Sequence, residues 1–290
     1  MIFIGETLFS KTKAIISEYE FTFKKKFGQN FLIDNHVLDK IISSAEIDKS
    51  DVVIEIGPGI GTLTAAIAEK AFKVIAVEID RTLIPILRDT LSEFYNIEII
   101  NEDILKVDIS AIAEKYSDKN IKVVANLPYY ITTPIIMEIL ERRLPIESMT
   151  VMVQKEVASR MGAEPSSKDY GSLSLSVQYF CKPYIVANVP RNCFIPRPNV
   201  DSAVIRLTIL KEPSAETKDV KLMFDIIKSA FSQRRKTLIN CIFNSGNLGF
   251  SKEEIMEILN KAGFDERVRG ETLKLSDFAK LSDIIYEKIH

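Results

Sequence analysis

The sequence has few of the residues on which metal, disulfide and histidine-based sites depend. Its 290 residues include three cysteines, two histidines and no tryptophan. Cys181, Cys193 and Cys241 show no paired spacing, which argues against disulfides and against a zinc site. His36 and His290 are too few for most triads or acid–base mechanisms that use histidine. We therefore expect no metal, and we expect a reducing compartment, the cytoplasm.

Long apolar runs are also missing. No run approaches the roughly 20 apolar residues that a transmembrane helix needs. The apolar residues at the start of the chain are interrupted by Glu6 and have no basic segment before them, so we expect no signal peptide. The remaining composition, with 46% hydrophobic and 27% charged residues, is ordinary for a globular protein. We expect no membrane contact and a monomer with one large and one small domain.

The chain lacks an excess of positive charge. Its formal net charge is −2, which is untypical of a protein that binds nucleic acid. The basic residues are nevertheless clustered, and clusters form a binding surface where folding gathers them on one face. The clusters are Lys24–Lys26, Arg142–Arg143, Arg191 with Arg197, Arg234–Lys236, and Arg267 with Arg269.

Short β-branched runs alternate with helix-length segments over the first two thirds of the chain. The first runs are almost continuously hydrophobic, which is typical of a parallel sheet covered on both faces. The alternation predicts a doubly wound α/β domain. The expected strands are 52–56, 74–77, 98–100, 123–125, 150–153, 173–179, 184–189 and 203–210, and the expected helices are 63–70, 83–94 and 134–142.

A polar segment, Lys211–Lys218, precedes a region in which every pattern is helical. Ser251 and Glu254 have the spacing of a capping box, and Gly263 is placed to end the same helix. We therefore predict a small all-helical domain at the C-terminal end. Its expected helices are 220–243, 252–261 and 276–290.

A glycine-rich turn follows the first strand of the α/β pattern. Gly57, Gly59 and Gly61 are spaced G-x-G-x-G, unlike the G-x-G-x-x-G of dinucleotide-binding folds. Pro58 also removes one backbone donor, which weakens the case for a pyrophosphate cradle. The turn alone identifies no ligand, because glycine-rich turns are common.

Acidic residues follow the next two strands. Glu78 ends the second strand, where an acid accepts the hydroxyls of a ribose, and Asp103 follows the third strand, where a side chain can accept from an adenine amine. An adenosine site without a strong phosphate cradle favours S-adenosylmethionine over NAD. The positive sulfonium suits an acid-rich rim, in which Glu55 is a further candidate.

Asn126-Leu127-Pro128-Tyr129 follows the strand expected at 123–125. It therefore lies at the carboxyl end of a strand, where α/β proteins place ligands. The tyrosine can stack on a flat ring, and the asparagine oxygen with a neighbouring carbonyl can accept both hydrogens of an exocyclic amine. These features point to adenine or cytosine as the substrate. Taken alone, the four residues favour an ordinary Asn-x-Pro turn, and it is the rest of the chain that favours a substrate site.

Several motifs in order along the chain resemble those of the ribosomal RNA adenine dimethyltransferases, specifically the bacterial enzymes that act on small-subunit RNA. The resemblance extends from about Thr12 to the C-terminus. It implies a Rossmann-like class I methyltransferase sheet with a small C-terminal all-helical domain. It divides the chain into an N-terminal helical extension (1–23), a methyltransferase domain (24–210) and an RNA-binding domain (211–290). The motifs are Lys24–Leu32, the glycine turn, Asn126–Tyr129, Phe194–Ser202 and Phe231–Leu238.

The resemblance also implies residue roles. Asn30, Leu32, Gly57, Gly59, Glu78, Asp103 and Asn126 would bind the cofactor. Asn126, Leu127, Pro128, Tyr129 and Phe194 would hold the target adenine, with the two rings on either side of it. Lys24, Lys25, Lys26, Arg197, Arg234, Arg235 and Lys236 would bind RNA.

The expected reaction is transfer of methyl groups from S-adenosylmethionine to N6 of two adjacent adenines in a loop of small-subunit RNA, during ribosome assembly. One alternative is a large-subunit methyltransferase of the antibiotic-resistance type, against which the Phe194–Pro198 and Ser232–Lys236 segments argue. A non-catalytic assembly factor on the same fold is a second alternative. An NAD-dependent oxidoreductase is a third, and the spacing of the glycine turn disfavours it.

Overall fold

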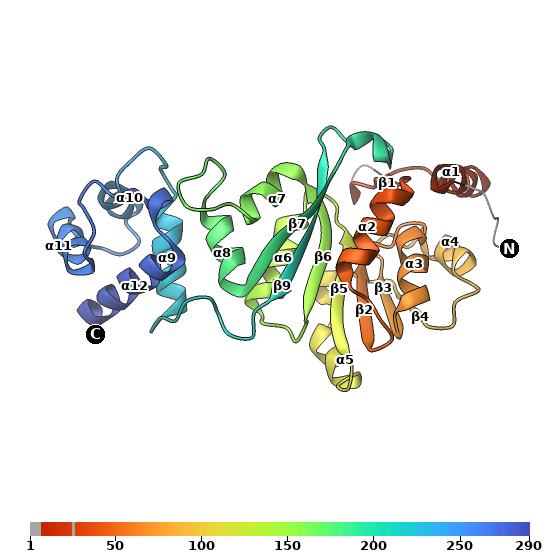
Figure 1. The fold of residues 1–290 in the computed structure, drawn as a ribbon, viewed down its shortest axis with the longest axis horizontal. Coiled ribbons are helices and arrows are strands. Elements are labelled where there is room, and N and C mark those ends of the chain that lie inside the picture. Colours follow the sequence, from red (N-terminus) through yellow and green to blue (C-terminus); the bar gives the residue numbers. More distant parts are fainter. Residues whose placement is uncertain (1–6, 25–26) are drawn as a thin grey trace. The chain divides into compact units, whose positions relative to one another are not determined.

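The computed structural model describes residues 7–24 and 27–290 (Figure 1). The chain forms two compact units. Unit 1 comprises the chain up to Ala158 together with Pro183–Ile209, and unit 2 comprises Ser159–Lys182 with Leu210–His290. This division differs from the expected domains in two segments, since 159–182 groups with the C-terminal helices and the described part of the N-terminal extension groups with unit 1. For 159–182 the reason is packing, because the centroid of the Tyr179 ring lies 5.2 Å from that of the Phe224 ring.

Unit 1 is built on a seven-stranded sheet within the described chain, in the order β4-β3-β2-β5-β6-β9-β7. Each neighbouring pair from β4 to β6 is parallel, as the sequence predicts, whereas β9 runs antiparallel to β6. The strands are β2 (Asp51–Ile56), β3 (Lys73–Val77), β4 (Ile97–Ile100), β5 (Asn120–Asn126), β6 (Ser148–Gln154), β7 (Cys181–Val189) and β9 (Ser202–Ile209).

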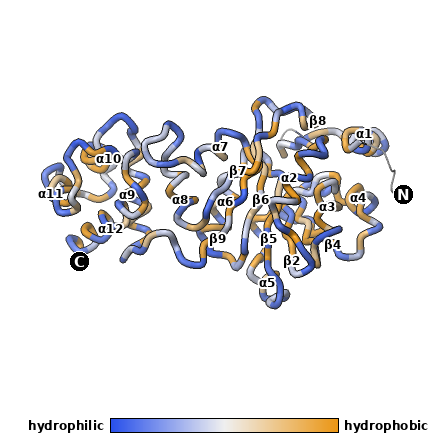
Figure 2. The backbone as a smooth tube through the Cα atoms, in the orientation of Figure 1, coloured by the Kyte–Doolittle hydropathy of each residue, from blue (hydrophilic) through white to orange (hydrophobic). Residues whose placement is uncertain are grey.

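The sheet of unit 1 is buried because its strands are apolar on both faces. All six residues of β2 are buried. Helices α2 (Asn35–Ala45) and α3 (Thr62–Lys70) lie side by side over one face and share a core with the strands (Figure 1). Figure 2 shows the same pattern as hydropathy, with hydrophobic residues gathered in the central strands. This packing holds the carboxyl ends of the strands in fixed positions.

Shorter elements complete unit 1. Within the described part of the expected N-terminal extension, helix α1 packs Ile15 and Ile16 against a cluster that includes Phe31 and Leu83, so it is part of this unit. The remaining elements are α1 (Leu8–Glu18), β1 (Phe31–Leu32), α4 (Ile84–Thr90), η2 (Ile104–Lys106), α5 (Ile109–Lys115), α6 (Thr132–Glu141), α7 (Lys155–Met161), η3 (Arg191–Cys193) and β8 (Phe194–Ile195), with α7 crossing into unit 2.

Unit 2 is helical. The capping box of Ser251 with Glu254 is present, and Gly263 ends the helix at a φ of +80°, so both predictions are confirmed. The strand expected at 173–179 is wrong. Apolar and polar residues alternate there as in a half-buried strand, but the segment forms helix α8, in which the polar Ser174 is buried beside the apolar residues. The single helix expected at 220–243 is also wrong, since it is interrupted after Ala230. The elements are α8 (Ser172–Phe180), α9 (Val220–Ala230), α10 (Leu238–Ser245), α11 (Lys252–Ala262), η4 (Gly270–Thr272) and α12 (Leu275–Ile289).

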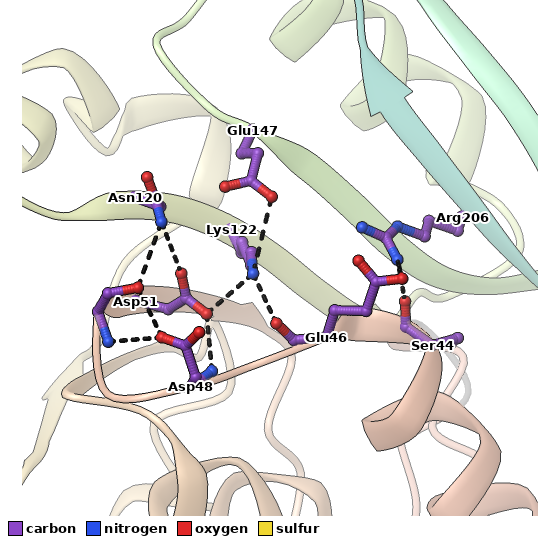
Figure 3. Close-up of polar contacts among 9 residues, drawn as sticks. Ser44, Glu46, Asp48, Asp51, Asn120, Lys122, Glu147 and Arg206 are labelled. Carbon is purple, nitrogen blue, oxygen red and sulfur yellow. Dashed lines mark hydrogen bonds and ion pairs between the residues drawn. The ribbon is translucent and has the colours of Figure 1, made fainter.

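A buried polar cluster lies at the amino-terminal ends of β2 and β5, on the side of the sheet away from the carboxyl ends of these strands (Figure 3). The ammonium of Lys122 lies 2.9 Å from a carboxylate oxygen of Asp51 and donates to the backbone oxygen of Glu46 at 2.7 Å. Asn120 donates to the other Asp51 oxygen at 3.2 Å. These contacts compensate two charges that folding removes from water.

No helix among the described residues has the length and apolar character needed to cross a membrane.

Candidate active site

A cavity opens at the carboxyl ends of β2, β3 and β5. The chain runs from β2 through β3 to β4 on one side and then returns to β5 on the other side of β2, so the strand order reverses at this point. Such a switch point is the usual ligand site of an open α/β sheet. The cavity brings together all the predicted cofactor residues and most of the predicted catalytic residues. These are Asn30, Leu32, Gly57, Gly59, Glu78, Asp103, Asn126, Leu127, Pro128 and Tyr129.

The glycine turn lines one wall of the cavity with bare backbone. Gly57 and Gly59 have φ values of +70° and +62°, which residues other than glycine rarely adopt. A Cβ on Gly57 would meet nothing within 4 Å, whereas one on Gly59 would lie 3.1 Å from the Phe31 ring. Gly57 thus leaves open space beside the backbone, as a ligand held close to the turn requires.

Two buried carboxyl groups face this wall. Glu78 is 5% exposed and accepts from the backbone N–H groups of Asp80 at 2.7 Å and Gly59 at 3.3 Å. Burial raises its pKa to about 7. Burial also raises the pKa of Glu55 to about 8, and its Oε2 has no hydrogen-bond partner among the described residues. Once ionised, carboxyl groups of this kind fit a ligand that brings hydroxyl groups and positive charge.

Asp103 closes the same side of the cavity from the end of β4. One of its carboxylate oxygens accepts from the Leu105 N–H at 3.1 Å and caps the short helix η2. Asn101 donates to the backbone oxygen of Glu78 at 2.6 Å, which ties the ends of β3 and β4 together. The two acids therefore stand on neighbouring strand ends, as the sequence predicts.

The Asn126–Tyr129 turn forms the opposite wall. Asn126 is the last residue of β5, and its Nδ2 donates to the backbone oxygen of Asn30 at 2.9 Å. The amide nitrogen must face that carbonyl, because a carbonyl only accepts, so Oδ1 remains available as an acceptor. The Tyr129 and Ser202 hydroxyls are 2.6 Å apart, and burial raises the pKa of Tyr129, so the phenol is neutral.

Phe194 is not brought to the cavity. It lies on β8, where it pairs with Leu32 of β1, and it is 3% exposed within the hydrophobic core. It is not among the residues that line the cavity. The strand pairing turns its ring inward, and this position supports a packing role.

The predicted RNA-binding residues have different surroundings. The Lys24 ammonium donates to Asp80 at 2.8 Å, while Lys25 and Lys26 lie outside the described residues. Arg197 is exposed. Arg234, Arg235 and Lys236 are exposed on the turns between α9 and α10 rather than on a helix, and Arg234 lies 3.7 Å from Glu271.

Sequence reasoning assigned no role to three residues at this site. Tyr130 lines the cavity and is 59% exposed. Gln29 and Asp80 form a hydrogen bond of 2.9 Å between segments that are 51 residues apart. Gln29 stands inside a recognised motif and Asp80 follows Glu78 by two positions, but spacing alone does not indicate that they meet.

Comparison with known proteins agrees with this geometry. The family described as "Ribosomal RNA adenine dimethylase" matches residues 20–281. The chain belongs to this family. It is 58% identical to "Ribosomal RNA small subunit methyltransferase A" of Lachnoclostridium phytofermentans, over all of both chains.

Solved structures show the same fold. A dimethyladenosine transferase from Plasmodium falciparum has a TM-score of 0.72 and 29% identity, over 87% of this chain and 95% of that one. The 23S rRNA methyltransferase ErmE has a TM-score of 0.68 and 27% identity, over 89% and 100% of the two chains. The predicted Rossmann-like class I methyltransferase fold is confirmed. The chain is an S-adenosylmethionine-dependent ribosomal RNA adenine dimethyltransferase, and the predicted enzyme class and cofactor are confirmed.

Proposed function

We propose that this enzyme transfers methyl groups from S-adenosylmethionine to N6 of two adjacent adenines in a loop of small-subunit ribosomal RNA, during ribosome assembly. The observation that carries the proposal is the position of Asn126. Its amide is fixed by Asn30 in the cavity that also contains Glu78. The 58% identity to a small-subunit enzyme, against 27% to ErmE, favours the small subunit over the large one.

S-adenosylmethionine, when bound, supplies an electrophilic methyl carbon on its sulfonium. Glu78 would accept the ribose hydroxyls, and Asp103 would accept from the adenine amine. Asn30 and Leu32 would cover the cofactor, and Gly57 and Gly59 would leave room beside the turn. These assignments use acceptors and open backbone that line one cavity.

Asn126 and Leu127 would orient the target amine. The N6 lone pair is delocalised into the ring, so the amine is a poor nucleophile. If Asn126 Oδ1 and the Leu127 carbonyl accept its two hydrogens, the lone pair faces the methyl carbon. A strong base is unnecessary, because the nitrogen loses its proton readily once it is cationic. Orientation of this kind can supply roughly 7–11 kcal/mol.

Tyr129 would stack on the target adenine, and Pro128 would restrict the turn. The base must leave its own stack, at a cost of a few kcal/mol that is smaller in a loop. Loops are also where proteins read RNA sequence most often. For the second methylation, the monomethylated amine would enter again with one remaining hydrogen to donate.

The exposed residues Arg197, Arg234, Arg235 and Lys236 would contact RNA phosphates. We further propose a cytoplasmic monomer that needs no metal. Among the described residues, no group of three or more His, Cys, Asp or Glu side chains is placed to hold a metal ion.

Methylation of isolated ribosomal subunits with labelled S-adenosylmethionine tests the proposal. We expect label in the small subunit, in dimethylated adenines that mass spectrometry maps to adjacent positions. Label confined to the large subunit would refute the choice of substrate. Normal RNA binding without any methyl transfer would favour the non-catalytic assembly factor.

A further inference from the structure

Asp80 is a buried acid for which no role in the reaction has been assigned. It is 2% exposed and follows β3 by three residues. One carboxylate oxygen accepts from Lys24 and from the Thr82 hydroxyl, each at 2.8 Å, and the other accepts from Gln29 Nε2 at 2.9 Å. Burial raises the pKa of Asp80, but these hydrogen bonds outweigh burial and lower it, so the acid is ionised.

Gln29 is fixed from both ends of its amide. Its nitrogen donates to Asp80, and its oxygen accepts from the backbone N–H of Lys24 at 2.8 Å. The next residue, Asn30, presents the backbone oxygen that receives the Asn126 amide at 2.9 Å. The carbonyl that orients Asn126 is therefore adjacent to a side chain that Asp80 holds.

The segment Phe27–Leu32 also rests directly on the Asn126–Tyr129 turn and on the tyrosine that follows it. A Cβ on Gly28 would lie 3.4 Å from Cβ of Pro128 and 3.5 Å from the Tyr130 ring. Asn30 Nδ2 donates to the Gly28 oxygen at 3.0 Å, which keeps the segment folded on itself. A shift of Gln29 would thus move the Asn30 carbonyl relative to Asn126.

We propose that Asp80 and Gln29 are positioning residues for catalysis, which hold the Asn30 carbonyl where it orients the Asn126 side chain. This inference rests on the proposed function of Asn126. The hydrogen bonds connect the two walls of the cavity, because Asp80 also donates its N–H to Glu78 at 2.7 Å. Catalytic geometry is sensitive to such support, since a displacement of about 1 Å can reduce a rate by roughly a hundredfold.

Reversal of the Asp80–Gln29 polarity tests the proposal. Asp80→Asn places an amide opposite the Gln29 amide, and we expect kcat to fall about tenfold while the cofactor Kd changes less than about threefold. Asp80→Asn with Gln29→Glu restores a donor opposite an acceptor and conserves net charge. We expect this double variant to recover kcat to within about threefold of the wild type.

Thr82→Val is the matched control. It removes one donor to Asp80 but leaves the oxygen that faces Gln29 unaltered. We expect its kcat to stay within about twofold of the wild-type value. A merely structural role for Asp80 predicts instead that Thr82→Val and Asp80→Asn lower stability and activity in parallel, without rescue by Gln29→Glu.

A second measurement is independent of RNA. The side-chain amide signal of Asn126 in ¹H–¹⁵N spectra is identified by its loss in Asn126→Ala. We expect Asp80→Asn to shift this signal, Asp80→Asn with Gln29→Glu to restore it, and Thr82→Val to leave it in place. An unmoved signal in Asp80→Asn overturns the inference whatever the enzyme methylates. A normal kcat in Asp80→Asn, or a loss confined to cofactor Kd, also overturns it.

Discussion

The hydroxyl oxygens of Tyr129 and Ser202 lie 2.6 Å apart and join the Asn126–Tyr129 turn to the first residue of β9. Ser202 is fully buried, so the contact restrains the phenol from the core side. We expect Tyr129→Phe and Ser202→Ala each to lower kcat/KM for RNA by roughly 2–10-fold, the worth of one hydrogen bond. Steady-state methylation assays measure this loss.

The double variant separates this contact from other effects of either change. Because both substitutions remove the same hydrogen bond, Tyr129→Phe with Ser202→Ala should be no slower than the slower single variant. Tyr129→Ala should be slower still, since base stacking on an aromatic ring is worth about 1–3 kcal/mol. Additive losses in the double variant would show that the two hydroxyls act separately.

Glu78 should make cofactor binding depend on pH. Burial raises its pKa to about 7, and the ionised form is the better acceptor for ribose hydroxyls. We therefore expect affinity for S-adenosylmethionine to rise as pH passes through about 7 and about 8 and to level off above about pH 9, with calorimetry as the measurement. Glu55, whose pKa is raised to about 8, adds to the effect in the same direction.

The control for this prediction is Glu78→Gln. It should bind the cofactor more weakly and with a shallower pH dependence, in which only Glu55 titrates. Ionisation of these two groups changes folding stability in the opposite direction. Because both folded-state pKa values lie above the unfolded value of about 4.3, these two groups should make the free enzyme less stable as pH rises from about 4 to about 8. Carboxyl groups whose pKa is lowered, such as Asp80, contribute in the opposite direction. An affinity that is constant with pH in the wild type would contradict the ribose role of an ionised Glu78.

Asn126 should matter for the chemical step more than for cofactor binding. We expect Asn126→Ala to lower kcat at least about a hundredfold, because its oxygen would no longer orient the amine, while the cofactor Kd changes less. Asn120→Ala is the control, since Asn120 begins the strand that Asn126 ends. Comparable turnover by Asn126→Ala and the wild type would contradict the proposed role.

Much of the site could be predicted from the sequence because parallel strands bring their carboxyl ends to the same end of the sheet. Glu78, Asp103 and Asn126 each follow an apolar run, so their meeting was predictable from pattern alone. Gln29 and Asp80 were not, because their contact depends on how a segment outside the sheet folds over it. The motif alone did not indicate that Phe194 lies outside the cavity, because the pairing of the two-residue strands β1 and β8 determines the direction of its ring.

The boundaries of unit 2 show the same limit. The segment 173–179 alternates apolar and polar residues like a strand, yet it forms helix α8 and packs against α9. The Arg234–Lys236 cluster was expected on a helix and lies on turns, since the helix of the preceding residues ends at Ala230. Periodicity over so few residues is a weak signal, and tertiary contacts decide the backbone conformation of short segments.

Asp51 and Lys122 should stabilise the fold without acting in catalysis, because they lie near the amino-terminal ends of β2 and β5, whereas the cavity lies at the carboxyl ends (Figure 3). Asp51→Ala leaves the buried ammonium of Lys122 without its main counter-charge, and we expect a loss of about 3–5 kcal/mol in the free energy of unfolding. Asp51→Ala with Lys122→Met removes both charges and should recover a large part of this loss. Urea denaturation measures each value, and kcat of the folded variants should stay near that of the wild type. A double variant no more stable than Asp51→Ala would mean that hydrogen bonds to Asp51, rather than charge pairing, stabilise this end of the sheet.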